Sequence, residues 1–138
     1  MAKISKNKQK QYGYSDEQAK ALNEGQAKLV EEIDTVDKYR VVAEVVKSEN
    51  CVAGHQVGDK FVMNAAGQLM PKECTNKDRL CLFAVGKLTH AAAIAFDRIM
   101  SGQDPTSGSV FGVMRCEDVG VENGGWGEIV MSIKVVEK

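Results

Sequence analysis

The apolar residues from Ser15 to about residue 34 recur every three or four positions, which predicts an amphipathic helix. The segment SDEQ marks its start, because Ser15 can cap the helix while Gln18 reaches back to the cap. The narrow apolar stripe, with polar Gln26 in its seam, suits pairing with another helix or packing on the protein's own sheet. Its members are Ala19, Leu22, Leu29, Ile33 and Val36.

From Tyr39 the pattern changes to the alternation typical of strands. The segment YRVVAEVVKS predicts a first strand, and a tight turn at Gly58 and Asp59 leads into a second. The segments VFGVMRCED and GEIVMSIKVVE predict a third and a fourth strand. Two sets of alternate positions should face inward: Val41, Ala43 and Val45 in the first strand, and Ile129, Met131, Ile133 and Val135 in the fourth.

Residues 78–101 give the strongest helical pattern, with Asp78 as a possible cap and Gly102 just past the end. At about 100 degrees per residue, one broad apolar face results, with Cys81 in its middle. His90 falls on the opposite, polar face, so Cys81 and His90 cannot bind one ion from this helix. The apolar face comprises Leu80, Ala84, Val85, Leu88, Ala91, Ala92, Ala95, Phe96 and Ile99.

The order of helix, two strands, long helix and two strands predicts an α+β fold. We expect a mostly antiparallel sheet with one long Ala-rich helix packed on it, plus an N-terminal helical extension. The domain organisation would be a flexible tail over 1–14, an N-terminal helix over 15–37 and an α+β domain containing the Cys and His residues over 38–138. The tail is assigned because residues 1–13 contain four lysines and few apolar side chains.

Charge and hydropathy exclude several classes of partner. The 18 basic and 19 acidic residues nearly cancel, so we expect no nucleic-acid or membrane partner. The longest apolar run, HAAAIAF, is far shorter than the ~20 residues that cross a bilayer. The segment MAKISKNKQKQYG lacks the apolar region of a secretory signal, which predicts a cytoplasmic protein. In that compartment the four cysteines should remain reduced.

The candidate chemistry lies in four soft donors: Cys51, His55, Cys81 and Cys116. Thiolate and imidazole are the ligands that zinc and iron-sulfur clusters use, so these residues are a candidate metal site. Asp59 would orient the His55 ring and strengthen its ligation. The chain has no Cys-x-x-Cys pair, however, and Cys81 and Cys116 would serve equally as core-filling residues. Cys74, in the segment PKECTNKD, is expected to be an exposed loop thiol.

Two other classes of function stay open. One is a thiol enzyme or redox sensor, with Cys51 or Cys81 as thiolate and His55 as base. The other is a structural protein that assembles through residues 15–36 or a sheet edge, with its cysteines buried. The chain contains no G-x-S-x-G elbow, no Walker A loop and no G-x-G-x-x-G after a strand, which disfavours nucleotide-dependent chemistry.

The segments CVAGHQVGDKF, LMPKEC, LCLFAVGKL and VMRCEDVG together resemble a small cysteine-containing family of anaerobic bacteria and archaea. Its pattern is a Cys before Val-Gly-Asp-x-Phe, a helix-opening Cys and a Cys-x-Asp before the last strand, matched here by Cys51, Cys81 and Cys116. Leu82 stands where the family often has proline, and residues 1–38 have no counterpart. The resemblance implies that the three cysteines act together in a metal-binding accessory protein or subunit of an anaerobic pathway. We therefore expect a homo-oligomer or a subunit of a larger enzyme.

Overall fold

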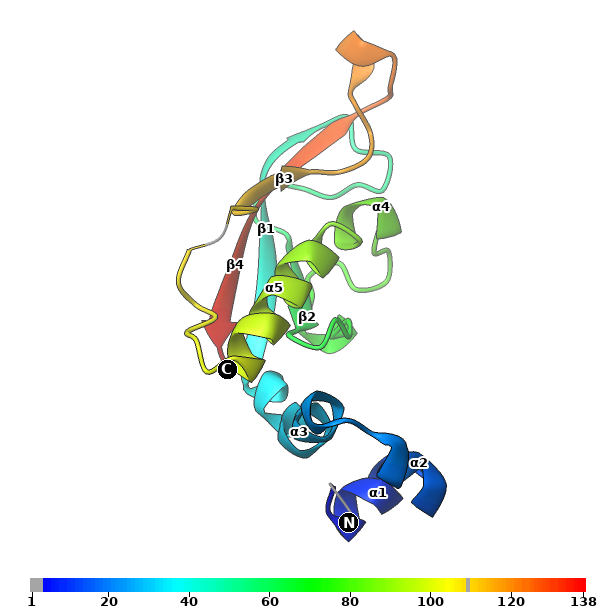
Figure 1. The fold of residues 1–138 in the computed structure, drawn as a ribbon. Helices are drawn as coiled ribbons and strands as arrows, with labels where there is room; N and C mark the ends of the chain where they lie inside the picture. The colour runs from blue at the N-terminus through cyan, green and yellow to red at the C-terminus, as the bar shows by residue number, and fades with distance from the viewer. Residues whose placement is uncertain (1–3, 109) are drawn as a thin grey trace.

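The computed structural model describes residues 4–108 and 110–138. It has an α+β fold built on one four-stranded antiparallel sheet, in the order β2-β1-β4-β3, with a helix across one face (Figure 1). The fold class predicted from the sequence is confirmed. The strands are β1 (Tyr39–Glu49), β2 (Lys60–Asn64), β3 (Val113–Arg115) and β4 (Glu128–Glu137).

The central strands β1 and β4 pair along almost their whole length, with a register shift between Val45 and Lys47. Their alternate residues form the core under the helix, as predicted: Val41, Ala43, Val45, Ile129, Met131 and Ile133 are buried. The third strand is shorter than predicted, because only Val113–Arg115 pair with β4. The chain leaves the edge of the sheet after Cys116, where the Asp118 carboxylate accepts three backbone N–H groups and folds the following loop around itself.

The helix predicted over 78–101 is divided into α4 (Leu82–Val85) and α5 (Leu88–Met100). The cap is Cys81 rather than Asp78, so Cys81 precedes the helix instead of lying within it. The chain bends at Gly86, where a Cβ atom would lie 3.0 Å from the Leu82 carbonyl oxygen. The predicted apolar face of α5 is confirmed, since Leu88, Ala91, Ala92 and Ala95 are buried against the sheet.

The N-terminal region is more ordered and more divided than predicted. It contains α1 (Lys6–Tyr12), α2 (Asp16–Ala21), α3 (Glu24–Glu32) and the 3-10 helix η1 (Ile33–Lys38). The mobile tail predicted over 1–14 is thus replaced from residue 6 by α1, whose ends Ser5 and Gly13 cap; residues 1–3 lie outside the described residues. The predicted Ser15–Gln18 capping box is present.

The single helix predicted over residues 15–37 is wrong because a second capping box interrupts it. The Asn23 side chain accepts the Gln26 N–H, and the Gln26 side chain accepts the Asn23 N–H, both at 2.8 Å. This pair of bonds starts α3 anew after the extended residue Leu22. Short local hydrogen bonds therefore outweigh the three-and-four periodicity that predicted one continuous helix.

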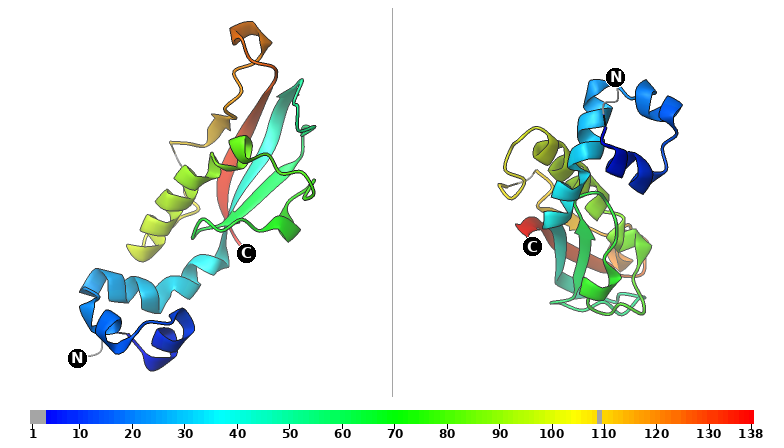
Figure 2. Two further views of the ribbon diagram at one scale, coloured as in Figure 1. Left: turned by 90° about the vertical axis from the view of Figure 1, so that its right-hand side faces the viewer. Right: turned by 90° about the horizontal axis from the view of Figure 1, so that it is seen from below.

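Helices α1–α3 lie at one end of the sheet, beside the C-terminal end of α5 (Figures 1 and 2). They enclose a small apolar cluster of their own, which comprises Ile4, Ala19, Ala27 and Val30. One link to the sheet domain is the Lys28 Nζ group, which donates to the Met100 carbonyl oxygen at 3.0 Å. Within residues 4–108 and 110–138, every helix is too short or too polar to cross a membrane.

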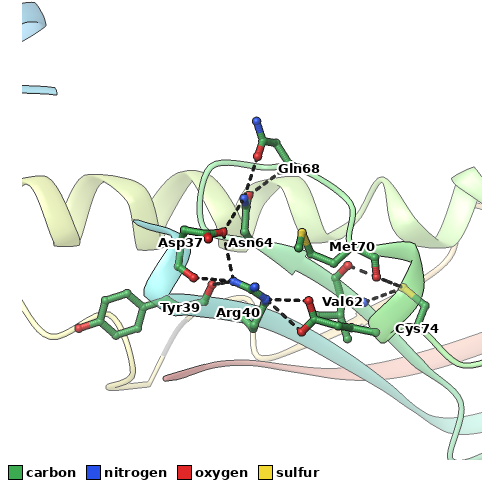
Figure 3. Close-up of polar contacts among 9 residues, drawn as sticks. Asp37, Tyr39, Arg40, Val62, Asn64, Gln68, Met70 and Cys74 are labelled. Atoms are coloured by element: carbon green, nitrogen blue, oxygen red, sulfur yellow. Dashed lines mark hydrogen bonds and ion pairs between the residues drawn. The ribbon is translucent and has the colours of Figure 1, made fainter. Parts of the chain in front are cut away.

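The outer edge of β2 is covered by the segment that contains the 3-10 helix η2 (Pro71–Glu73) and Cys74 (Figure 3). The Cys74 sulfur accepts the Val62 N–H at 3.2 Å, while Glu73 binds the buried Arg40 through both carboxylate oxygens. Cys74 is buried rather than exposed, and this burial raises the pKa of its thiol. The prediction of an exposed loop thiol is wrong, because this cysteine satisfies a backbone donor of an edge strand.

Candidate functional site

Three of the four cysteines line one pocket of about 610 Å³. The end of β1 and the start of α4, which carry the chain to two of them, lie away from α1–α3 (Figure 1). Cys51, Cys81 and Cys116 come from three separate segments, are partly exposed, and form no disulfide. The rest of the lining is mainly apolar, with three charged residues: Val52, Ala53, Arg79, Phe83, Asp118, Gly127, Glu128 and Ile129. The structure thus brings together the three sulfur-bearing residues that the sequence singled out.

Local features determine how each cysteine reaches the pocket. Cys51 follows β1 after Asn50, which has a positive φ of 53° and turns the chain off the sheet. Cys81 is the cap residue of α4, and its carbonyl accepts the N–H groups of Ala84 and Val85. Cys116 directly follows β3 and donates its N–H to Ile129 of β4 at 3.2 Å. The ends of two strands and the start of a helix therefore lead the chain to the three thiols.

His55 lies behind the pocket rather than on its lining. It is 1% exposed, and its ring packs edge-on against Phe61 with 4.8 Å between ring centroids. Its Nε2 accepts the backbone N–H of Cys81 at 3.3 Å. His55 therefore ties the loop after β1 to the start of α4, where it fixes the backbone of Cys81.

The other ring nitrogen of His55 also has polar neighbours. Because Nε2 accepts a hydrogen bond, the neutral ring carries its proton on Nδ1. Nδ1 lies 3.7 Å from the Asp59 carboxylate and 3.4 Å from the Asn76 side-chain nitrogen. Burial lowers the pKa of His55, an effect that Asp59 partly opposes. The Gly58 turn thus brings Asp59 to the ring, and Asp59 also accepts the Gln56 N–H.

The loop 118–127 closes another side of the pocket. The Asp118 carboxylate accepts the N–H groups of Gly120, Trp126 and Gly127 at 3.0 to 3.1 Å, and these bonds lower the pKa of Asp118. The loop approaches the Cys51 segment so closely that a Cβ on Gly127 would lie 2.0 Å from the Asn50 carbonyl oxygen. Glycine at residue 127 is therefore required for the contact between the two loops.

Sequence reasoning missed Asp118 as a functional residue of the site. The signal was available, because an aspartate two residues after Cys116 is followed by the glycine-rich segment NGGWG. Short acidic side chains readily accept backbone N–H groups in such loops. Asp118 organises the loop that joins β3 to β4, and this loop supplies Asp118 and Gly127 to the pocket lining.

The second acidic lining residue, Glu128, is paired as well. It accepts the Lys47 ammonium at 3.0 Å and lies 2.8 Å from the Arg115 guanidinium. The hydrogen bond from Lys47, and to a smaller extent the charge of Arg115, lower the pKa of Glu128. Arg79 differs, because its exposed side chain has no hydrogen bond or ion pair with any residue of 4–108 or 110–138.

The predicted metal site of Cys51, His55, Cys81 and Cys116 is only partly assembled. Among the described residues, no group of three or more His, Cys, Asp and Glu side chains is arranged to hold a metal ion. The Nε2 of His55 accepts the Cys81 N–H, so this nitrogen is already engaged. Zinc or an iron-sulfur cluster therefore stays a prediction from the sequence. His90, predicted on a polar face, is exposed on α5 beside Phe111.

Comparison of the chain with protein-family models, with curated proteins and with solved structures finds no match. The resemblance to a cysteine-containing family of anaerobes, and the accessory role that it implies, accordingly stay predictions. Function has to be inferred from the three cysteines and the pocket that they line.

Proposed function

We propose that the chain is a thiol protein, a thiol-based enzyme or redox sensor, whose site is the pocket lined by Cys51, Cys81 and Cys116. The observation that carries this proposal is the convergence of three partly exposed cysteines, from three separate segments, on one open pocket. Cysteines that only fill a core have no need of a shared opening to solvent. A reactive thiol does need one, because its reaction partner must reach the sulfur.

Cys74 supplies the contrast within the same chain. It is buried at the edge of β2, where its sulfur bonds to backbone groups and burial raises the pKa of the thiol. A raised pKa leaves less thiolate, and the thiolate is the nucleophile. Cys74 is therefore the structural cysteine of this proposal and the internal reference for the other three.

His55 acts in this proposal as a positioning residue rather than as a general base. A base must accept a proton from the thiol, but the Nε2 of His55 already accepts the Cys81 N–H. The ring is also buried and its pKa is lowered, which favours the neutral form. What His55 contributes is a fixed backbone position for Cys81 at the rim of the pocket.

Alkylation of the native, reduced protein tests the proposal. Iodoacetamide is added in limiting amounts, and mass spectrometry of peptides follows each of the four cysteines separately. We expect at least one pocket cysteine to react about tenfold or more faster than Cys74, as its access and thiolate content require. Equal and slow reaction of all four cysteines would reject a thiol function.

Oxidation by hydrogen peroxide gives a second readout. It separates a redox-active thiol from a surface thiol that is alkylated but has no function. A thiolate attacks hydrogen peroxide, an S–O bond forms and the O–O bond breaks, giving sulfenic acid and hydroxide. We expect the pocket cysteines to be oxidised before Cys74 and to be recovered by dithiothreitol. If Cys74 is oxidised first, after the whole protein has unfolded, a redox role for the pocket cysteines is contradicted.

Metal binding is the second candidate function, favoured by the same convergence of three soft donors on one pocket. Metal binding requires the three sulfur atoms to move closer together than they are in this structure, since the described residues contain no group arranged for a metal ion. Anaerobic purification followed by metal analysis and a visible spectrum tests it. About one equivalent of zinc or iron, lost in Cys51→Ser, is the expected result; a blank analysis of both proteins would exclude it.

A further inference from the structure

We infer that the pocket of Cys51, Cys81 and Cys116 takes a small ligand with one anionic group and an apolar body, and that Arg79 binds the anionic group. This inference rests on the proposed function, because it names the class of ligand for the same pocket. It follows from two properties of the lining: the state of its charges and the exposure of its apolar side chains.

Among the described residues of the lining, Arg79 is the one cation without a partner. Asp118 is held by three backbone N–H groups, and Glu128 is held by Lys47 and Arg115. Both carboxylates are therefore satisfied within the protein. Within the described part of the chain, the Arg79 side chain has neither a hydrogen bond nor an ion pair, although it lines the pocket. A guanidinium binds carboxylate and phosphate oxygens in a two-pronged geometry, so an anionic group matches this residue.

The apolar part of the lining favours a ligand with an apolar body. Val52 and Phe83 are 80% and 70% exposed although they border the pocket, and Ala53 and Ile129 lie beside them. Covering such side chains is favourable, because apolar surface is removed from water. A ligand that is anionic at one end and apolar at the other can pair with Arg79 and cover Val52 or Phe83 while it reaches a thiol.

A matched pair of alkylating reagents tests the charge requirement. Iodoacetate is anionic and iodoacetamide is neutral, yet both react in the same way: the thiolate sulfur displaces iodide, a C–S bond forms, the C–I bond breaks and the thiol proton passes to the buffer. The measured quantity is the ratio of the iodoacetate rate to the iodoacetamide rate at each pocket cysteine, at low ionic strength. Low ionic strength is used because dissolved salt screens the interaction between exposed charges.

Arg79→Gln should lower this ratio about fivefold at the pocket cysteines, as expected for the loss of one unit charge about 4 Å from the anion in water. Arg79→Lys keeps the charge and should largely keep the ratio. Lys77→Gln is the matched control, because it removes a positive charge from the same exposed segment outside the pocket lining. An unchanged ratio in Arg79→Gln, or an equal fall in Lys77→Gln, overturns the inference.

Protection experiments test the apolar body. Hexanoate should slow the alkylation of the pocket cysteines by iodoacetamide at a concentration at which acetate does not, and Arg79→Gln should remove this protection. Equal protection by both acids, or protection by neither, overturns the requirement for an apolar body.

Failure of the proposed function and failure of the ligand class give different experimental results. If no pocket cysteine reacts with iodoacetamide faster than Cys74, the proposed function fails and the ligand class fails with it. If the pocket cysteines react rapidly but Arg79→Gln leaves the ratio of the iodoacetate rate to the iodoacetamide rate unchanged, only the ligand class fails.

Discussion

His55 determines the geometry of the site although it does not line the pocket. Its ring is buried against Phe61, and it joins two loops through the Cys81 N–H and the Asp59 carboxylate. Its lowered pKa gives this structural role a dependence on pH. Because burial disfavours the charged ring, the folded chain takes up a proton on His55 only at a pH below the ordinary value of 6.5.

We predict that stability falls as the pH drops below about 6.5, the ordinary pKa of histidine, toward the lower pKa of the folded protein. The unfolded chain binds the His55 proton first in this range, so proton binding favours unfolding. Urea unfolding at a series of pH values from about 7.5 to about 5.5 measures the effect. The lowered pKa values of Asp118 and Glu128 place their own contributions at more acidic pH.

Two histidine variants identify the source of this dependence. His55→Gln should be less stable than the wild type and should lose the decline in stability over this range. His90→Gln retains His55 and should retain the decline. His55→Gln removes the ring nitrogen that accepts the Cys81 N–H. This variant should therefore change the alkylation rate of Cys81 more than the alkylation rate of Cys116. A decline that persists in His55→Gln would show that another group causes it.

Among elements, the loop 118–127 has the strictest steric requirement near the site. Its Asp118 carboxylate gathers three N–H groups, and its Gly127 packs on the Asn50 carbonyl oxygen. We predict that Gly127→Ala destabilises the protein by about 1–3 kcal/mol, as overpacking against backbone does. Thermal unfolding measures the loss, and hydrogen exchange should be faster in this loop and around Cys51.

Gly108→Ala is the control for this substitution, because a Cβ at Gly108 meets nothing within 4 Å. Its melting temperature should stay close to that of the wild type. If Gly127→Ala were as stable as Gly108→Ala, the two loops could not be in the close contact that shapes the pocket.

Helices and strands also show where sequence patterns are reliable. The inward faces of β1, β4 and α5 follow directly from their apolar periodicity, since burial of one face is all that the pattern needs. The breaks at Asn23 and Gly86 do not follow from periodicity. The break at Asn23 depends on a reciprocal pair of hydrogen bonds between side chains and backbone. At Gly86 the chain tightens into three-residue turns, in which the Lys87 and Thr89 N–H groups donate to the carbonyls of Ala84 and Gly86.

In the whole molecule, helices α1 and α2 stand apart from the sheet (Figure 2), and neither contributes to the lining of the pocket of Cys51, Cys81 and Cys116. Their apolar cluster is separate from the main core, whereas Val36 of η1 packs with Ala65 and Ala95. We predict that deletion of residues 1–22 leaves the sheet domain folded and the alkylation rates of the pocket cysteines unchanged. Circular dichroism and mass spectrometry of the alkylated cysteines measure both properties.

The same deletion tests the expectation that the chain assembles through its N-terminal helix. Light scattering of the full and shortened chains gives their masses in solution. A smaller assembly after deletion would support pairing through this region. The same mass in both would remove these helices from the explanation of any oligomer, and altered alkylation rates would show that they do reach the site.

The sequence by itself determined the α+β class, the inward faces of two strands and one helix, and the residues worth testing as a site. Those properties depend on neighbours within one or two turns of the chain. Only the tertiary structure decided that Cys51, Cys81 and Cys116 share a pocket, that His55 stands behind it and that Cys74 is buried. These relations depend on strand pairing and on loop contacts between distant residues, which no local pattern encodes.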